Sequence, residues 1–155
     1  MDQDLEYRQQ QIQDYKRILL PLLRYLPWLE EKSGTEVSTL FRGEGLEEHS
    51  VVFPVYDATL MNFVREASKS ELMDRNYLYV YSRRGIRSHD DERRLIQKAD
   101  IRDWDMLRGI FSKYVLGGRT KAILWSEAVS ERIFYLVMKQ MKEIVEYWDK
   151  PIDVR

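Results

Sequence analysis

The sequence contains no cysteine and only two histidines among its 155 residues. The absence of cysteine excludes a disulfide framework, a thiolate zinc site, an iron–sulfur cluster and a cysteine nucleophile. His49 and His89 are not spaced as a metal-ligand pair, and the G-x-S-x-G turn of a serine hydrolase is missing. We therefore expect a protein with no metal, no cofactor and no catalytic site, and hence not an enzyme.

Long apolar runs are also missing. The longest, from Ile18 to Leu23, is interrupted by Pro21 and is far shorter than the ~20 residues of a membrane-spanning helix. The first residues, Met1-Asp2-Gln3-Asp4, are acidic where a secretory signal would be basic. These observations predict a cytoplasmic protein without membrane contact.

The net charge of −1 conceals an uneven distribution of charge. Residues 1–74 carry 8 basic and 14 acidic side chains, and residues 75–121 carry 12 basic and 6 acidic ones. Two explanations fit this pattern. The acidic and basic segments pack together and cancel, or the basic segment presents a patch to an anionic partner.

The first segment has apolar residues at heptad spacing, which predicts a helix up to Ser33-Gly34. Pro21 predicts a kink, or two helices that meet near Leu20. The apolar seam could form a coiled-coil dimer, or it could dock onto its own domain. The candidate seam residues are Leu5, Ile12, Tyr15, Leu19, Leu22 and Leu26.

Further along the chain, helix signals are frequent. Asp57 is a plausible N-cap for a helix, and Ser88-x-x-Asp91 and Asp100-x-x-Asp103 resemble capping boxes. The last of these precedes the clearest apolar stripe, and a long terminal helix is expected from about residue 126 to 148. These signals predict one mainly α-helical domain, residues 1–155, of about five or six helices.

Only a small amount of β-structure is expected. Residues 35–50 have the composition of a loop, whereas residues 51–56 are β-branched and aromatic and favour an extended strand. The composition of residues 77–81 favours a strand that would pair with residues 51–53, but a helix under tertiary control is the alternative. A minor two-stranded ribbon, 51–56 with 77–81, is therefore the most that we expect.

Alternating tyrosines stand beside several arginines in the basic segment, which is the best local case for a ligand. Aromatic rings stack on bases while guanidinium groups hold phosphates, and an extended segment would place the three tyrosines on one face. The alternative is that the tyrosines cover a small core beside solvated arginines. The candidate contact residues are Tyr77, Tyr79, Tyr81, Arg83, Arg84 and Arg87, together with Arg119 and Lys121.

The loop that carries Arg119 and Lys121 follows the glycine pair Gly117-Gly118. Its main-chain N–H groups could face an anion, although the spacing is not that of a P-loop. An ordinary helix C-cap followed by a turn explains the same residues, and this interpretation is favoured.

Three motifs resemble a family of small uncharacterised bacterial proteins that contain a domain of unknown function and are often carried on mobile elements. They are Phe53-Pro54-Val55-Tyr56-Asp57, Tyr79-Val80-Tyr81-Ser82-Arg83 and the run from Ser112 to Lys121, which continues into Leu124-Trp125-Ser126. The resemblance covers residues 51–151. It implies an accessory role and assigns no activity to any residue.

The sequence therefore favours a non-enzymatic accessory protein that acts through protein–protein contact or self-association. The alternative is a nucleic-acid-binding accessory protein that uses residues 77–87 and the 117–121 loop.

Overall fold

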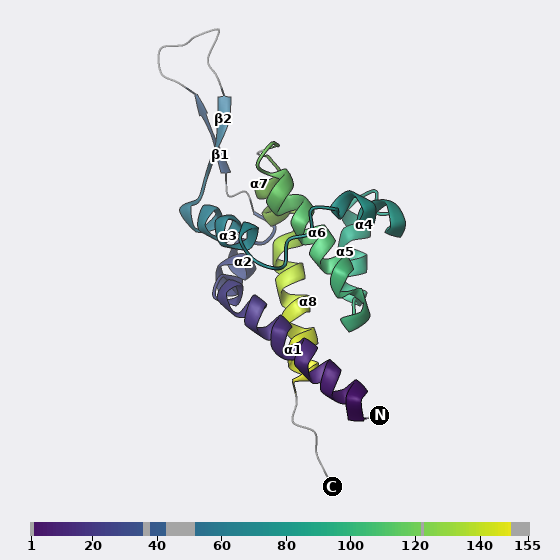
Figure 1. Ribbon diagram of the computed structural model, residues 1–155. Helices are drawn as coiled ribbons and strands as arrows, with labels where there is room; N and C mark the ends of the chain where they lie inside the picture. The colour runs from purple at the N-terminus through teal and green to yellow at the C-terminus, as the bar shows by residue number, and fades with distance from the viewer. Residues whose placement is uncertain (1, 36–37, 43–51, 122, 150–155) are drawn as a thin grey trace.

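The computed structural model describes residues 2–35, 38–42, 52–121 and 123–149. Within these ranges the chain forms eight α-helices, one short 3₁₀-helix and one antiparallel pair of strands (Figure 1). The fold is mainly α, as expected, but it has more helices than the five or six that the sequence indicated. The elements are α1 (Asp2–Leu23), α2 (Leu26–Lys32), β1 (Ser38–Arg42), β2 (Val52–Tyr56), α3 (Ala58–Ser68), α4 (Tyr77–Arg84), α5 (His89–Lys98), η1 (Ile101–Asp103), α6 (Trp104–Gly117), α7 (Ile123–Ser130) and α8 (Ile133–Trp148).

Helix α8 occupies the centre of the molecule and contacts α1, α2, α5, α6 and α7 (Figure 1). The buried residues form one hydrophobic core that extends from Ile12 on α1 to Val145 on α8. At its middle, Phe63, Phe111 and Phe134 pack edge to face, with ring centroids 5.2–5.8 Å apart. Aromatic pairs prefer this geometry, so the three rings fix α3, α6 and α8 relative to one another.

The apolar seam of α1 faces the protein's own core. Ile12, Leu19 and Leu22 are each only 1% exposed. Tyr15 stacks on Trp104 of α6 with ring centroids 4.0 Å apart. Of the other candidate seam positions, Leu26 packs partly buried against the core and Leu5 is 52% exposed. This seam is therefore not available for a coiled-coil dimer.

Helix α1 continues through Pro21 and ends at Leu23, so of the two alternatives the one with two helices that meet near Leu20 is wrong. The break comes at residues 24–25, and α2 starts at Leu26 with Pro27 in its first turn, where proline is tolerated. The expected end at Ser33-Gly34 is confirmed, because Ser33 is the C-cap and Gly34 has a φ of +85°.

The capping signals mark helix starts correctly. The Asp57 carboxylate accepts a hydrogen bond from the Thr59 N–H at 2.7 Å, and the Ser88 hydroxyl accepts one from the Asp91 N–H at 3.1 Å. Asp100 and Asp103 form a reciprocal capping box at η1, which leads directly into α6. Local side-chain chemistry therefore fixes the N-terminal ends of α3, α5 and η1.

The single long terminal helix expected from residue 126 to 148 is two helices. Arg132 has a φ of +67°, which ends α7 and starts α8 in a new direction. Arg93 of α5 donates hydrogen bonds to both the main-chain oxygen and the carboxylate of Glu131, and these bonds hold the turn. The break depends on this tertiary contact, because residues 130–132 contain neither glycine nor proline.

The expected ribbon between residues 51–56 and 77–81 is wrong, because Tyr77–Arg84 is the helix α4. Strand β2 pairs instead with β1, Ser38 opposite Tyr56 and Arg42 opposite Val52, within a segment whose composition suggested a loop. The contact between α4 and α6 is the most extensive of any two described helices. This packing is the tertiary control under which residues 77–81 were expected to form a helix instead of a strand.

No helix within the described ranges is long and apolar enough to cross a membrane.

Candidate functional site

A buried carboxylate organises the part of the molecule where α4, α5 and α6 meet. Glu92 of α5 is 1% exposed. Its Oε1 accepts a hydrogen bond from the Tyr114 hydroxyl at 2.7 Å, and its Oε2 accepts one from the Tyr81 hydroxyl. Lys113 Nζ lies 3.6 Å from Oε2, and His89 Nδ1 lies 2.9 Å from Oε1. We call these five residues the Glu92 cluster.

The four partners of Glu92 occupy all the sites at which its carboxylate can accept a hydrogen bond. A carboxylate offers about four lone-pair sites, and two hydroxyls, one ammonium group and one imidazole surround it. Since each contact is charge-assisted, together they offset the large cost of burying the negative charge. Glu92 has no free site for a substrate proton, so the arrangement favours a structural role over general base catalysis.

The two tyrosines of the cluster hold their protons strongly. Burial raises the pKa of Tyr81, and the neighbouring charge of Glu92 raises it further. Burial also raises the pKa of Tyr114, together with its hydrogen bond to Glu92. Both hydroxyls are therefore donors to the carboxylate throughout the neutral range.

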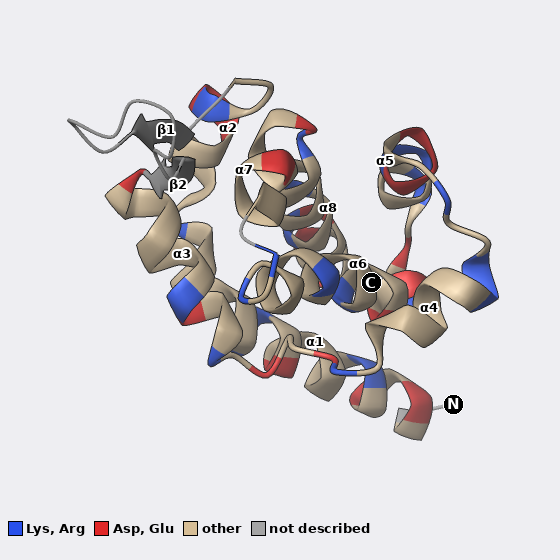
Figure 2. Ribbon diagram, turned by 90° about the horizontal axis from the view of Figure 1, so that it is seen from above, with Lys and Arg blue, Asp and Glu red and all other residues tan. Residues whose placement is uncertain are grey.

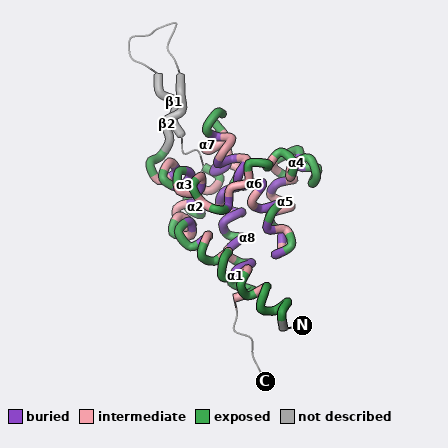
Figure 3. Tube along the Cα trace, viewed as in Figure 1, coloured by how far each residue is buried: buried purple, intermediate pink, exposed green. Residues whose placement is uncertain are grey.

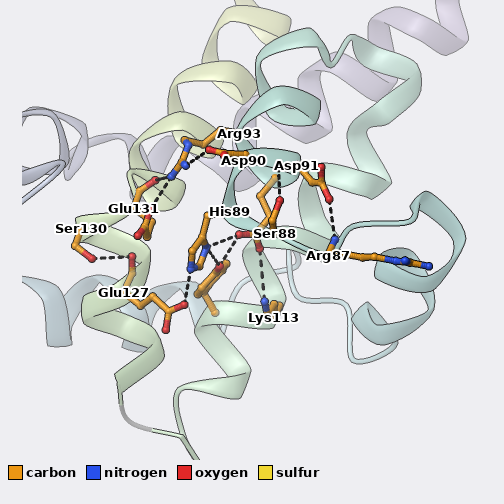
Figure 4. Close-up of polar contacts among 12 residues, drawn as sticks. Arg87, Ser88, His89, Asp90, Asp91, Arg93, Lys113, Glu127, Ser130 and Glu131 are labelled. Carbon is orange, nitrogen blue, oxygen red and sulfur yellow. Dashed lines mark hydrogen bonds and ion pairs between the residues drawn. The ribbon is translucent and has the colours of Figure 1, made fainter.

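His89 connects the cluster to α7. Its Nε2 lies 2.7 Å from Oε1 of Glu127, on the opposite side of the ring from Glu92, and Figure 4 shows contacts on both sides of the imidazole. The imidazole therefore lies between a carboxylate of α5 and a carboxylate of α7. The two carboxylates do not converge on one point, and no group of three His, Cys, Asp or Glu among the described residues could hold a metal ion.

Helix α4 is attached to the protein through its inner side, mainly against α6. None of its residues is fully buried, and Figure 3 shows it at the periphery. The Tyr81 hydroxyl reaches Glu92, Val80 packs on Gly109 of α6, and Arg84 pairs with Asp103 at 3.2 Å. An added Cβ at Gly109 would lie 2.8 Å from Val80, so only glycine permits this close approach.

The outer side of α4 carries large apolar residues in contact with solvent. Leu78 is 72% exposed and Tyr79 is 57% exposed. Tyr79 and Arg83 are four residues apart and share one side of the helix, and Arg75 lies in the turn just before the helix. We call Arg75, Leu78, Tyr79 and Arg83 the α4 face. Figure 2 shows the basic residues at the C-terminal end of this helix.

A pocket of about 380 Å³ lies beside the α4 face, between α4, the start of α6 and the segment before α4. Four arginines and two aspartates contribute to its lining, which gives these ionised side chains a net charge of +2. The charged lining residues are Arg75, Arg83, Arg84, Arg108, Asp74 and Asp105.

Several other cations of the basic segment are neutralised close by. Arg93, Arg94 and Arg102 form ion pairs with Asp90, Asp91 and Asp100 respectively, and Arg93 also pairs with Glu131. The acids come mainly from the same segment, so the acidic N-terminal half is not what balances it. The cations of the segment that have no ion-pair partner among the described residues are all exposed: Arg75, Arg83, Arg87, Lys98, Arg119 and Lys121.

The structure separates the three candidate tyrosines. In a helix, Tyr77 and Tyr81 lie on one side and Tyr79 lies on the other, so the shared face expected for an extended segment is wrong. Tyr77 is half-buried with its hydroxyl beside Gly117, and Tyr81 belongs to the Glu92 cluster. Tyr79 alone remains available for stacking.

The 117–121 loop does not join the α4 face. Arg119 lines a different pocket, formed by α3, the end of α6 and Trp125, which shares no residue with the pocket beside α4. Arg119 and Lys121 are both exposed. The glycine pair has a packing role: a Cβ on Gly118 would fall on the indole of Trp125, whose Nε1 donates to the Val115 carbonyl at 3.0 Å.

Sequence reasoning missed the Glu92 cluster. The pair His89 and Glu92, three residues apart behind an N-cap serine, was the one local signal for it. Tyr114 and Glu127 are distant in sequence and reach the cluster only because α6 and α7 pack against α5. The chain matches no family model, no curated protein and no solved structure.

Proposed function

We propose that the protein is a non-enzymatic accessory protein that acts through protein–protein contact, and that the α4 face is its docking surface. The observation that carries the proposal is the exposure of Leu78 and Tyr79 on a peripheral helix, beside a pocket with net positive charge. Exposed aromatic and arginine side chains are enriched where proteins bind one another. The partner of this surface is a protein with an acidic segment, because that charge complements the pocket.

The Glu92 cluster supports the proposal by holding α4 in place. A docking helix that is preorganised loses less entropy when a partner binds. Tyr81, Val80 and Arg84 fix the inner side of α4, so its outer residues are presented on a rigid element. The accessory role implied by the resemblance of residues 51–151 is compatible with this function.

Binding of nucleic acid is the second candidate, and the unpaired Arg75, Arg83 and Arg87 favour it. It is the weaker candidate because only Tyr79 is free to stack on a base, and because Arg119 and Lys121 lie at another pocket. A gel-shift titration against single- and double-stranded DNA and RNA at two salt concentrations tests it. A shift that is strongest at low salt and lost in Arg75→Glu with Arg83→Glu would favour nucleic acid over protein.

Quantitative co-purification tests the protein-docking function. The tagged wild type is compared with Leu78→Ser plus Tyr79→Ser, and with Leu20→Ser, which changes an equally exposed apolar residue on α1. We expect a protein that is retained by the wild type and by Leu20→Ser and lost by the α4 variant. Equal recovery of every co-purifying protein with all three forms would contradict the proposal.

A further inference from the structure

The pocket beside α4 contains two kinds of arginine. Arg84 pairs with Asp103, and Arg108 pairs with Asp105 at 3.2 Å. Arg108 also donates to the main-chain oxygens of Leu72 and Met73 at 3.2 and 3.1 Å. These two guanidinium groups are held by the protein itself and form a fixed wall of the pocket.

The other two arginines, Arg75 and Arg83, have no ion-pair partner within the described part of the chain. Arg75 lies in the turn before α4 and Arg83 lies four residues after Tyr79 on the helix, and all three residues line the same pocket. The Asp74 carboxylate in the same lining accepts a hydrogen bond from the Asn76 N–H at 2.9 Å and is engaged in that turn. The pocket therefore offers two guanidinium groups without an ion pair, and with the charge of Asp74 counted its lining keeps a net charge of +2.

We infer that this pocket binds the phosphate group of a phosphorylated side chain on the protein partner. A phosphate monoester carries a charge of about −1.5 to −2 at neutral pH, which matches two free guanidinium groups better than one carboxylate does. Guanidinium groups also bind phosphate oxygens through two parallel N–H donors. A single concave pocket of about 380 Å³ accommodates one such group, whereas a nucleic-acid strand needs a continuous basic track.

The exposed apolar residues explain why the phosphate would be carried on a protein. Tyr79 lines the pocket, and the exposed Leu78 precedes it on the same helix, so the two side chains provide contact area for the residues that flank a phosphorylated side chain. Phosphate recognition by arginine clusters with adjoining apolar contacts is a general mode of peptide binding. The inference rests on the proposed docking function of the α4 face and names the chemical group that it selects.

Titrations followed by ¹H–¹⁵N NMR test the inference on the full chain. The probes are inorganic phosphate, a short alanine-rich peptide with one phosphoserine, the same peptide with serine or glutamate at that position, and a single-stranded oligonucleotide. We expect shifts confined to residues 74–84 and 105–108, with binding of the phosphoserine peptide at least about tenfold tighter than that of the serine and glutamate peptides.

Two double variants localise the site. Arg75→Gln with Arg83→Gln should weaken binding of the phosphoserine peptide about tenfold or more, and Arg17→Gln with Arg119→Gln should leave it unchanged. No shift of residues 74–84 with phosphate or phosphopeptide overturns the inference, as does tighter binding of the oligonucleotide. If a protein partner still requires Leu78 and Tyr79 but not Arg75 and Arg83, the docking function stands and the phosphate pocket fails.

Discussion

The hydroxyl of Tyr81 on α4 donates a hydrogen bond to the carboxylate of Glu92, which is almost completely buried on α5. This bond joins the proposed docking helix to the polar centre of the protein. The same carboxylate accepts from Tyr114 of α6, and His89 extends the connection to Glu127 of α7. One buried charge therefore positions three helices around α5, and α4 depends on it more than the others because it buries no side chain completely.

Replacement of Glu92 should be strongly destabilising. Glu92→Leu leaves the hydroxyls of Tyr81 and Tyr114 and the ammonium group of Lys113 without their acceptor, and we expect a loss of about 3 kcal/mol in the free energy of unfolding. Tyr81→Phe removes one charge-assisted bond and should cost about 1.5 kcal/mol. Urea denaturation measures both, and Tyr7→Phe, at an exposed tyrosine on α1, is the matched control. A Glu92→Leu protein as stable as that control would contradict the account of the cluster.

The raised pKa values of Tyr81 and Tyr114 predict a specific loss of stability in alkali. In the unfolded chain tyrosines ionise near pH 10, while these two remain protonated in the folded state. Their contribution is therefore complete below pH about 10 and declines above it, by up to about 1.4 kcal/mol per pH unit for each tyrosine.

Urea denaturation as a function of pH checks this prediction. Tyr81→Phe with Tyr114→Phe should show a shallower decline in the free energy of unfolding above pH about 10 than the wild type. Tyr79→Phe, at an exposed tyrosine of the same helix, should decline as the wild type does. Identical slopes for the wild type and the double variant would show that the two hydroxyls are not held by Glu92.

The glycine pair should respond asymmetrically to alanine. A Cβ on Gly118 would overlap the rigid indole of Trp125, whereas one on Gly117 would lie 2.9 Å from the Cδ1 methyl of the flexible Leu124. We expect Gly118→Ala to cost about 3 kcal/mol and Gly117→Ala about 1 kcal/mol. Thermal unfolding by circular dichroism compares the two, and a Gly118→Ala protein that melts with the wild type would refute the packing of Trp125 on this turn.

Two adjacent leucines of α1 distinguish a core helix from a dimer seam. Leu19 is 1% exposed and Leu20 is 63% exposed. Leu19→Asp buries an unpaired charge and should unfold the protein, whereas Leu20→Asp should change its free energy of unfolding by less than about 0.5 kcal/mol. Circular dichroism with light scattering over a dilution series measures both. If the wild type is a dimer and Leu19→Asp is a folded monomer, the seam is a dimer interface, which would contradict this account.

Elements with local signals were predictable from the sequence. The N-caps Asp57 and Ser88 and the capping box of Asp100 and Asp103 act within one helical turn, and they marked α3, α5 and η1 correctly. The helical state of residues 77–84 was not predictable in this way, because their β-favouring composition is overridden by the packing of Val80 on Gly109.

Only some residues of the candidate site could be identified from the sequence. The exposed residues Tyr79 and Arg83 were identified as contact residues, but Leu78 was not, because its exposure follows from the helical state of α4, and Arg75 was not, because it lies in the turn before the helix. The Glu92 cluster joins residues as far apart as Tyr81 and Glu127, and such contacts depend on the packing of whole helices. The same is true of the break at Arg132, which Arg93 stabilises from α5.

Site-specific photo-cross-linking in the host cell tests the central claim most directly. A photoreactive amino acid replaces Tyr79 on α4 in one form and Leu20 on α1 in the other, both of them exposed side chains. Docking through α4 predicts a discrete protein adduct at position 79 that is absent at position 20. A nucleic-acid adduct at position 79, or the same adducts at both positions, would contradict it.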